Sequence, residues 1–267
     1  MKQNKEKGID PIMKLEILEN FRKKIAEGPV FGPFCKTGDP AFIECAGYAG
    51  FDFAILDTEH GPVSYESMQN NIRAAEVSGI LPVIRTQDFS ESSIGKALDI
   101  GALGVEIPQI TSAEDAKTAI RHAKFFPEGE RGVCRFVRAA HYSATERSEY
   151  FKRANQALVI LQLEGRKAIE NLDEILAVKG IDIIFIGPYD LSQSLGVPGQ
   201  VTHPTVIARM KEIVDRCASL GITVGTFVDT PETAKMWRDA GVRYLSYSVD
   251  VGIFYEACRA IVENARK

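Results

Sequence analysis

The feature that most constrains the fold of this chain is a regular alternation of short apolar segments with longer amphipathic ones. Eight short segments have the apolar, β-branched composition of strands buried on both faces, and helical spacing of apolar residues follows each one. These expected strands span residues 30–35, 53–56, 82–85, 104–108, 158–164, 181–187, 223–227 and 244–247. The expected helices include 13–27 before the first strand, 167–178 after the fifth and a closing helix over 254–266. Eight strand–helix units in 267 residues, with no linker between them, predict a single-domain α/β protein, a (β/α)8 TIM barrel.

Motifs and composition disfavour several other classes of protein. A doubly wound sheet would carry a Gly-rich turn after an early strand, and no Gly-x-Gly-x-x-Gly is present. A net charge of -4 with scattered basic residues argues against a nucleic-acid partner. No apolar run approaches the ~20 residues that span a bilayer, so no membrane partner is expected.

The ends of the chain and its cysteines predict domain bounds and location. Residues 1–12 form a polar tail without the apolar core of a signal peptide, which leaves 13–267 as the barrel domain. The five cysteines are far apart and never in a Cys-x-x-Cys spacing. We therefore expect a reducing, cytoplasmic location rather than a disulfide framework.

Polar side chains follow the expected strands where each one ends. In a barrel these positions share one face, which is where the chemistry takes place. Residues 51–62 are the densest example, because a buried strand runs into Asp57, Glu59 and His60 before Gly61-Pro62 stops it. A polar loop with a capping Asp is the alternative interpretation of that stretch alone. The full set of strand-end side chains is Lys36, Asp57, Glu59, His60, Arg85, Gln109, Gln162, Glu164, Asp190, Thr226, Ser246 and Ser248.

Two carboxylates of this set predict a metal site. Gln162 and Glu164 are two positions apart on one strand and so point the same way. A Glu that faces a barrel interior is costly unless it is paired or metal-bound. Glu164 with Asp190, completed by water and a bidentate substrate, is the sparse oxygen-rich shell that Mg²⁺ or Mn²⁺ prefers, with Co²⁺ as a further candidate. The alternative is a structural salt bridge between Glu164 and Arg85.

Several of these residues resemble the motifs of one family. The motifs are Asp57-x-Glu59-His60-x-Pro62, the strand end Arg85, Gln162-x-Glu164, Gly187-Pro188-x-Asp190-Leu191-Ser192, and Gly129-x-Arg131-Gly132 in the long connection after residue 125. In this order and spacing they resemble the HpcH/HpaI aldolases, which are metal-dependent class II enzymes acting on 2-oxo acids. The resemblance runs from about residue 32 to residue 251. It implies reversible cleavage of a 4-hydroxy-2-oxo acid to pyruvate and an aldehyde.

The resemblance also implies a role for each matching residue. Glu164 and Asp190 would hold the divalent ion, which would chelate pyruvate and act as a Lewis acid for the enolate. His60 would be the general base, directly or through water. Arg85 would stabilise the developing oxyanion, and Gln162 would orient the substrate. Family members form trimers or hexamers, so a homotrimer or homohexamer is expected, with Phe254, Tyr255 and Ile261 of the last helix as a candidate apolar contact.

Four further assignments are less direct. The family pairs its His with an Asp that corresponds to Asp99, which here ends a helix near the opposite face of its own barrel. We expect Asp99 to reach His60 only through an unusual turn or from a neighbouring subunit, or else to be a helix-end residue. Tyr189 stands where many members carry a small residue, so its ring could narrow the substrate pocket or donate a hydroxyl. Asp57 and Glu59 are expected to tune His60 rather than to bind metal.

Three other functions stay open on the sequence. A related metal-dependent lyase could cleave a CoA thioester of the malyl or citramalyl type, although no nucleotide pocket can be pointed to. Schiff-base aldolase chemistry would use Lys36, the lysine at a strand end on the expected face. A non-catalytic barrel that serves as a scaffold is the third possibility.

Overall fold

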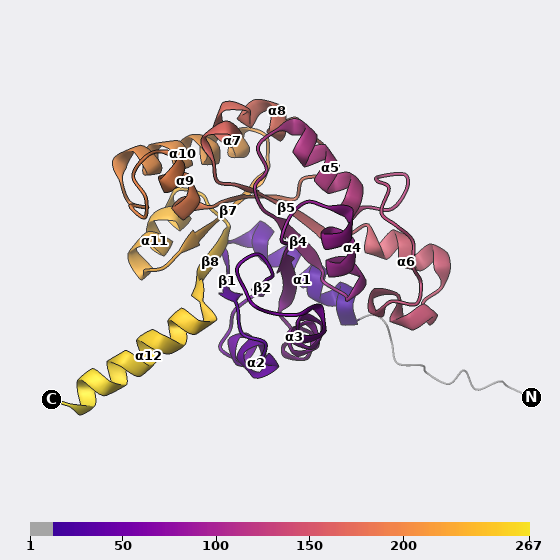
Figure 1. The fold of residues 1–267 in the computed structure, drawn as a ribbon, viewed down its shortest axis with the longest axis horizontal. Helices are drawn as coiled ribbons and strands as arrows, with labels where there is room; N and C mark the ends of the chain where they lie inside the picture. Colours follow the sequence, from indigo (N-terminus) through magenta and orange to yellow (C-terminus); the bar gives the residue numbers. More distant parts are fainter. Residues whose placement is uncertain (1–12) are drawn as a thin grey trace, which may run out of the picture.

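The strands close into the expected barrel. The structure is a computed structural model that describes residues 13–267, so the predicted polar tail 1–12 lies outside the described residues. Eight parallel strands pair in sequence order and β1 pairs with β8, which confirms the single-domain (β/α)8 barrel (Figure 1). The strands are β1 Val30–Cys35, β2 Phe53–Asp57, β3 Leu81–Arg85, β4 Gly104–Ile107, β5 Leu158–Leu163, β6 Ile183–Ile186, β7 Thr223–Val228 and β8 Tyr244–Val249.

Helices follow the strands with three departures from the expected pattern. The helices are α1 Met13–Glu27, α2 Pro40–Tyr48, α3 Tyr65–Ser78, α4 Glu91–Asp99, α5 Ala113–Ala123, α6 Arg147–Ala154, α7 Arg166–Glu170, α8 Leu172–Leu176, α9 Pro188–Ser194, α10 Pro204–Ser219, α11 Pro231–Asp239 and α12 Asp250–Ala265. The helix expected over 167–178 is divided into α7 and α8. A short helix, α9, was not expected, and the long connection contains a 3-10 helix, η1 Arg138–Ser143, and the start of α6.

Serine caps define where three loops at the carboxyl ends of the strands stop. Ser64, Ser90 and Ser112 precede α3, α4 and α5, and each side chain accepts the N–H of the third helical residue. A cap of this kind stabilises a helix by about 1 kcal/mol. These caps limit the length of the loops that follow β2, β3 and β4, and so shape one side of the barrel mouth.

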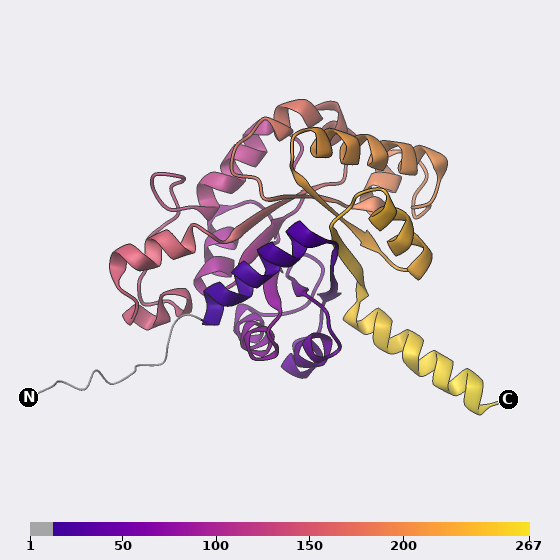
Figure 2. The same ribbon diagram turned by 180° about the vertical axis from the view of Figure 1, so that it is seen from behind.

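The barrel interior is apolar toward the amino-terminal ends of the strands and charged at their carboxyl ends. The lower layers contain aromatic and branched side chains from several strands, including Phe53 and Tyr244, whose rings stack with centroids 4.0 Å apart. Helix α1 lies across the amino-terminal end of the barrel and places Phe21 against both rings (Figure 2). The upper layer is different, because Asp57 and Arg85 stand opposite one another in the register of β2 and β3. The charged layer lies at the carboxyl ends of the strands.

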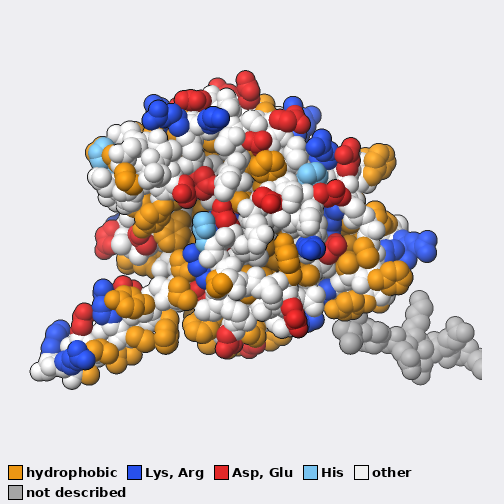
Figure 3. Space-filling model, viewed as in Figure 1, with side chains coloured by type: hydrophobic (Ala, Val, Ile, Leu, Met, Phe, Trp, Pro, Cys, Tyr) orange, Lys and Arg blue, Asp and Glu red, His pale blue; other side chains and the backbone are white. Residues whose placement is uncertain are grey.

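Helix α12 leads away from the barrel instead of covering it. It begins at Asp250, four residues before the predicted start of the closing helix, and projects outward (Figure 1). Figure 3 shows hydrophobic side chains along this helix. Its exposed large apolar residues are Val251, Ile253, Phe254, Tyr255, Ile261 and Val262. Among residues 13–267, no helix is both long and apolar enough to cross a bilayer.

The tight approach of β1 to β2 yields a test of the interior packing. A Cβ at Gly32 would lie 2.2 Å from the carbonyl oxygen of Phe53 and 2.5 Å from its ring, whereas a Cβ at Gly28 would meet nothing within 4 Å. We expect Gly32→Ala to lower the free energy of unfolding by about 2–3 kcal/mol, because overpacking forces the strands apart. Gly28→Ala should change it by less than about 0.5 kcal/mol. Urea unfolding measures both, and equal midpoints for the two variants would contradict the packing.

Candidate active site

A buried ion pair between Asp57 and Arg85 forms the centre of the site. Arg85 donates from Nε to Asp57 Oδ1 at 2.9 Å and from Nη2 to Oδ2 at 2.7 Å. Both side chains are buried, and the guanidinium also lies 4.5 Å from the ring centroid of Phe34. Burial by itself raises the pKa of Asp57, but the hydrogen bonds and charge of Arg85 outweigh it and hold that pKa below its ordinary value. The pair is therefore fully charged and fixed in orientation.

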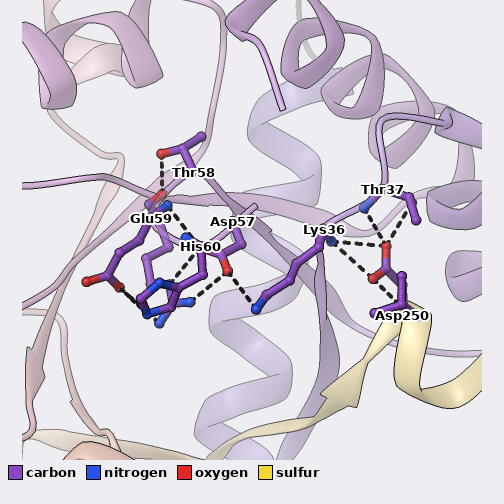
Figure 4. A network of polar contacts seen from close by, with 9 residues as sticks. Lys36, Thr37, Asp57, Thr58, Glu59, His60 and Asp250 are labelled. Carbon is purple, nitrogen blue, oxygen red and sulfur yellow. Dashed lines mark hydrogen bonds and ion pairs between the residues drawn. The ribbon is translucent and has the colours of Figure 1, made fainter. Parts of the chain in front are cut away.

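The turn after β2 wraps around the Asp57 carboxylate and presents His60 to solvent. The backbone N–H groups of Glu59 and His60 donate to Asp57 Oδ1 at 3.1 and 3.3 Å (Figure 4). A Cβ at Gly61 would lie 2.2 Å from the Asp57 carbonyl oxygen, so this turn needs glycine. His60 Nε2 lies 3.8 Å from Glu59 Oε2, and Glu59 Oε2 lies 3.2 Å from Arg85 Nη1. The structure thus brings Asp57, Glu59, His60 and Arg85 together at the carboxyl ends of β2 and β3.

Glu164 lies in a cradle built by three neighbouring segments. The N–H of Gln109 donates to Glu164 Oε1 at 2.8 Å, and the Gln162 amide donates to Oε2. Gln109 has a left-handed backbone (φ 60°), which lets its side-chain amide also donate to Glu59 Oε1 at 3.1 Å. A Cβ at Gly187 would lie 2.9 Å from Glu164 Oε2, so only glycine leaves this space free. Gln109 links Glu164 to the Asp57–Arg85 centre.

The residues around Glu164 fit a hard divalent cation. Burial raises the pKa of Glu164, and the charges of Glu59 and Asp190 act the same way against the hydrogen bonds from Gln162 and Gln109. A nearby cation would relieve this repulsion. No group of three or more His, Cys, Asp or Glu side chains in the described part of the chain forms a metal cage. Two carboxylates with open positions match Mg²⁺, which keeps several waters and binds substrate oxygens.

The alternative role of Glu164, a structural salt bridge, is not what the structure contains. The ion pairs described for Arg85 are with Asp57 and Glu59. Glu164 receives neutral amide donors instead. Glu164 therefore has no basic partner among the described ion pairs, which leaves its carboxylate available to a cation.

The sequence reasoning missed Glu106, a fully buried carboxyl in β4. It stands opposite Arg85 in the strand register, and neither of its oxygens has a hydrogen-bond partner within residues 13–267. Burial raises the pKa of Glu106 to about 8; Arg85 opposes this, while Asp57 and Glu164 add to it. The signal in the sequence was a lone acidic residue inside an apolar strand, which a list of strand ends alone overlooks.

Tyr189 lies at the same mouth, and its hydroxyl is hydrogen-bonded to another side chain of the protein. It follows Pro188 at the start of α9 and is exposed beside Asp190. Its hydroxyl donates to Asp229 Oδ2 at 2.6 Å, and its ring packs edge-on against Phe227. Burial, together with the hydrogen bond and charge of Asp229, raises the pKa of Tyr189 to about 12. Tyr189 thus forms part of the wall of the mouth, and Asp229 is a second residue that the sequence reasoning missed.

Asp99 lies at the other end of the barrel. It ends α4, which leads into the start of β4, whereas His60 follows the end of β2. Its carboxylate pairs with Arg131 Nη2 at 2.6 Å. Within one chain, Asp99 is therefore a helix-end residue that binds the long connection. Its catalytic assignment stays a prediction that depends on a neighbouring subunit.

The comparisons with known proteins agree with this geometry. The chain belongs to the HpcH/HpaI aldolase/citrate lyase family, whose model matches residues 31–257, which confirms the resemblance and the expectation of a lyase-class enzyme. A hydroxypyruvate/pyruvate aldolase from Paraburkholderia phytofirmans is 34% identical over 89% of this chain and 94% of its own length. A 2-dehydro-3,6-dideoxy-6-sulfogluconate aldolase from Pseudomonas putida is 31% identical over 83% and 87%. The crystal structure of a family protein from Burkholderia cenocepacia superimposes with a TM-score of 0.88, at 29% identity over 94% of this chain and 99% of that one.

The buried carboxyl of Glu106 generates a prediction about pH. Its pKa is about 8 in the folded chain and near 4.5 when exposed, so the folded state binds the extra proton between these values. The contribution of Glu106 to the free energy of unfolding is therefore fully present below about pH 4.5 and is lost as the pH rises toward 8. We expect Glu106→Gln to remove this loss, so that its free energy of unfolding relative to wild type rises by up to about 4 kcal/mol between pH 5 and 8.

Chemical denaturation of the EDTA-treated protein at each pH measures this difference. Glu170→Gln, which changes an exposed carboxyl on α7, is the matched control and should run parallel to wild type. Parallel curves for Glu106→Gln and wild type would show that Glu106 is not held protonated.

Proposed function

We propose that this chain is a divalent-metal-dependent aldolase that reversibly cleaves a 4-hydroxy-2-oxo acid to pyruvate and an aldehyde. The observation that carries the proposal is the cradle of Glu164. It holds a part-buried carboxylate beside Asp190, with no basic partner among the described ion pairs, at the same mouth as Arg85 and His60. The similarity to a hydroxypyruvate/pyruvate aldolase, a 2-dehydro-3,6-dideoxy-6-sulfogluconate aldolase and a 2-keto-3-deoxy-L-rhamnonate aldolase supports it. All five cysteines are free thiols, which supports a cytoplasmic location.

The proposed metal site uses Glu164 and Asp190. Mg²⁺ or Mn²⁺, with Co²⁺ as a third candidate, would supply Lewis-acid stabilisation of the charge that develops on the 2-oxo oxygen. Gln162 holds the Glu164 carboxylate in place and directs its amide toward the same space. Asp190 and the backbone around Tyr189, at the start of α9, would orient the 2-oxo acid at the same site.

His60 carries out the proton transfers as the general base. In the cleavage direction its imidazole accepts the proton of the C4 hydroxyl, the C3–C4 bond breaks, and the aldehyde carbonyl forms. The electron pair passes to the pyruvate half as an enolate, and His60 returns the proton to C3 to give pyruvate. Arg85 places its guanidinium beside the developing oxyanion. Asp57 holds Arg85 in place, and Glu59 Oε2 lies 3.8 Å from His60 Nε2.

Removing one metal ligand tests this assignment. Asp190→Ala should lower metal-dependent pyruvate release from a panel of 4-hydroxy-2-oxo acids by about 100-fold or more, and should weaken Mn²⁺ binding in calorimetry. Asp239→Ala, which removes an exposed carboxylate on α11, is the control and should keep full activity. EDTA should abolish release in both wild type and the control.

Other results would point to the competing chemistries. Release that persists in EDTA and in Asp190→Ala would refute the metal assignment. A borohydride-trapped mass adduct with pyruvate would instead identify a Schiff base on Lys36. Faster cleavage of malyl- or citramalyl-CoA than of any short hydroxy-oxo acid would favour the thioester lyase, and His60→Ala without loss of any activity would favour a non-catalytic barrel.

We also propose that the enzyme is a homotrimer or homohexamer that uses α12. The exposed residues Val251, Phe254, Tyr255, Ile261 and Val262 recur at helical spacing and so form one apolar face. Within the described residues, the ring of Phe254 on this face contacts the ring of Phe42 on α2, with the two centroids 6.2 Å apart. An apolar face of this length on a projecting helix is typical of a protein–protein contact.

The mass of the assembly in solution tests the role of α12. The double variant Phe254→Gln, Ile261→Gln should dissociate the trimer or hexamer to smaller species in size-exclusion chromatography with light scattering. The double variant Glu256→Gln, Glu263→Gln alters the polar face of the same helix, where both residues face Arg259, and should keep the assembly. A wild-type monomer at micromolar concentration, or an unchanged mass for the first variant, would contradict the proposal.

A further inference from the structure

The Lys36 ammonium is a cation at the mouth whose donors make no hydrogen bond within the part of the chain that the structure describes. Its Nζ lies 3.8 Å from Asp57 Oδ2, which is too far for a hydrogen bond, and the side chain is 31% exposed. No hydrogen bond from this Nζ is found within residues 13–267. Asp57 does not need it, because that carboxylate already accepts two bonds from Arg85 and two from backbone N–H groups.

The backbone that carries Lys36 is nevertheless held firmly. The buried Asp250 carboxylate accepts the N–H of Lys36 at 3.0 and 3.1 Å and the N–H of Thr37 at 2.9 Å. It also accepts the Thr37 hydroxyl at 2.7 Å. Figure 4 shows the Lys36 side chain leaving this anchor and pointing toward Asp57 and the His60 ring. A fixed starting point reduces the conformational freedom that a bound ligand would have to restrict.

Lys36 lies across the mouth from the proposed metal site. A chain of contacts of 2.7 to 3.8 Å connects the two places. Its members in order are Lys36, Asp57, Arg85, Glu59, Gln109 and Glu164. A 2-oxo acid bound at Glu164 would react beside Arg85 and His60, and the aldehyde half would continue toward Lys36.

We propose that Lys36 determines acceptor specificity by binding an anionic group at the far end of the aldehyde. This inference rests on the aldolase function proposed above and adds the substrate class, an aldehyde with a terminal carboxylate or phosphate. A charged ammonium with free donors suits such an oxyanion. A Schiff-base role fits less well, because lysine nucleophiles lie in apolar pockets or beside other cations, and Lys36 lies beside a carboxylate.

Matched aldehydes test the proposal in the aldol direction with pyruvate and Mn²⁺. The first pair is 4-oxobutanoate and its methyl ester, and the second is glyceraldehyde 3-phosphate and glyceraldehyde. We expect wild type to prefer the anionic aldehyde over its neutral partner in one of the two pairs. A preference in the first pair indicates a carboxylate, and a preference in the second indicates a phosphate.

Lys36→Met should reduce the ratio of kcat/KM for the anionic aldehyde to that for its neutral partner by about 10- to 100-fold, mainly through KM. Lys36→Arg should retain part of the preference, and Lys235→Met, on the exposed side of α11, should leave it unchanged.

Two results would overturn the proposal. One is a wild-type enzyme without preference for either acid, and the other is an equal loss for the acid and its neutral partner in Lys36→Met. Exchange of the pyruvate methyl protons with D₂O, followed by NMR, reports the aldolase function without any aldehyde. If the pyruvate methyl protons exchange but the wild-type enzyme shows no preference for an anionic aldehyde, only the role of Lys36 is overturned. Absence of both exchange and pyruvate release overturns the aldolase function and the role of Lys36 with it.

Discussion

The ion pair between Asp57 and Arg85 is the interaction on which the rest of the site depends. Transferring two charges from water into a protein interior costs several kcal/mol per ion, and good geometry is needed to offset that cost. The strand register supplies this geometry, because β2 and β3 end side by side. The same carboxylate gathers the N–H groups of the following turn, which presents His60. One buried charge pair therefore fixes both the guanidinium and the backbone that carries His60.

Most of the fold could be predicted because barrel strands are buried on both faces. Val30–Cys35 and Met13–Glu27 have the bounds that the apolar pattern predicted. The pattern could not predict the division between α7 and α8, or α9, because short helices at loop ends depend on local packing more than on periodicity. Nor could it predict the direction of α12. An apolar helix face shows that a partner is needed, and does not show whether that partner is the same barrel or another chain.

The site was predictable where its residues lie at strand ends and unpredictable where they meet across the barrel. Asp57 and Arg85 come together as expected. Glu106 was missed because its meaning depends on register, which places it opposite Arg85. Asp250 was missed because it lies 214 residues from Lys36 in the sequence. The catalytic role predicted for Asp99 would need a neighbouring subunit, because within the chain its carboxylate pairs with Arg131.

The position of Asp250 connects the proposed assembly through α12 with the position of Lys36 at the mouth. This residue opens α12, the helix whose apolar face projects from the barrel, and its carboxylate holds the end of β1. A shift of the helix axis would move that carboxylate and the backbone it anchors. Natural variation in how subunits meet would then also change the reach of the mouth-lining lysine, so assembly and substrate choice would evolve together in this barrel.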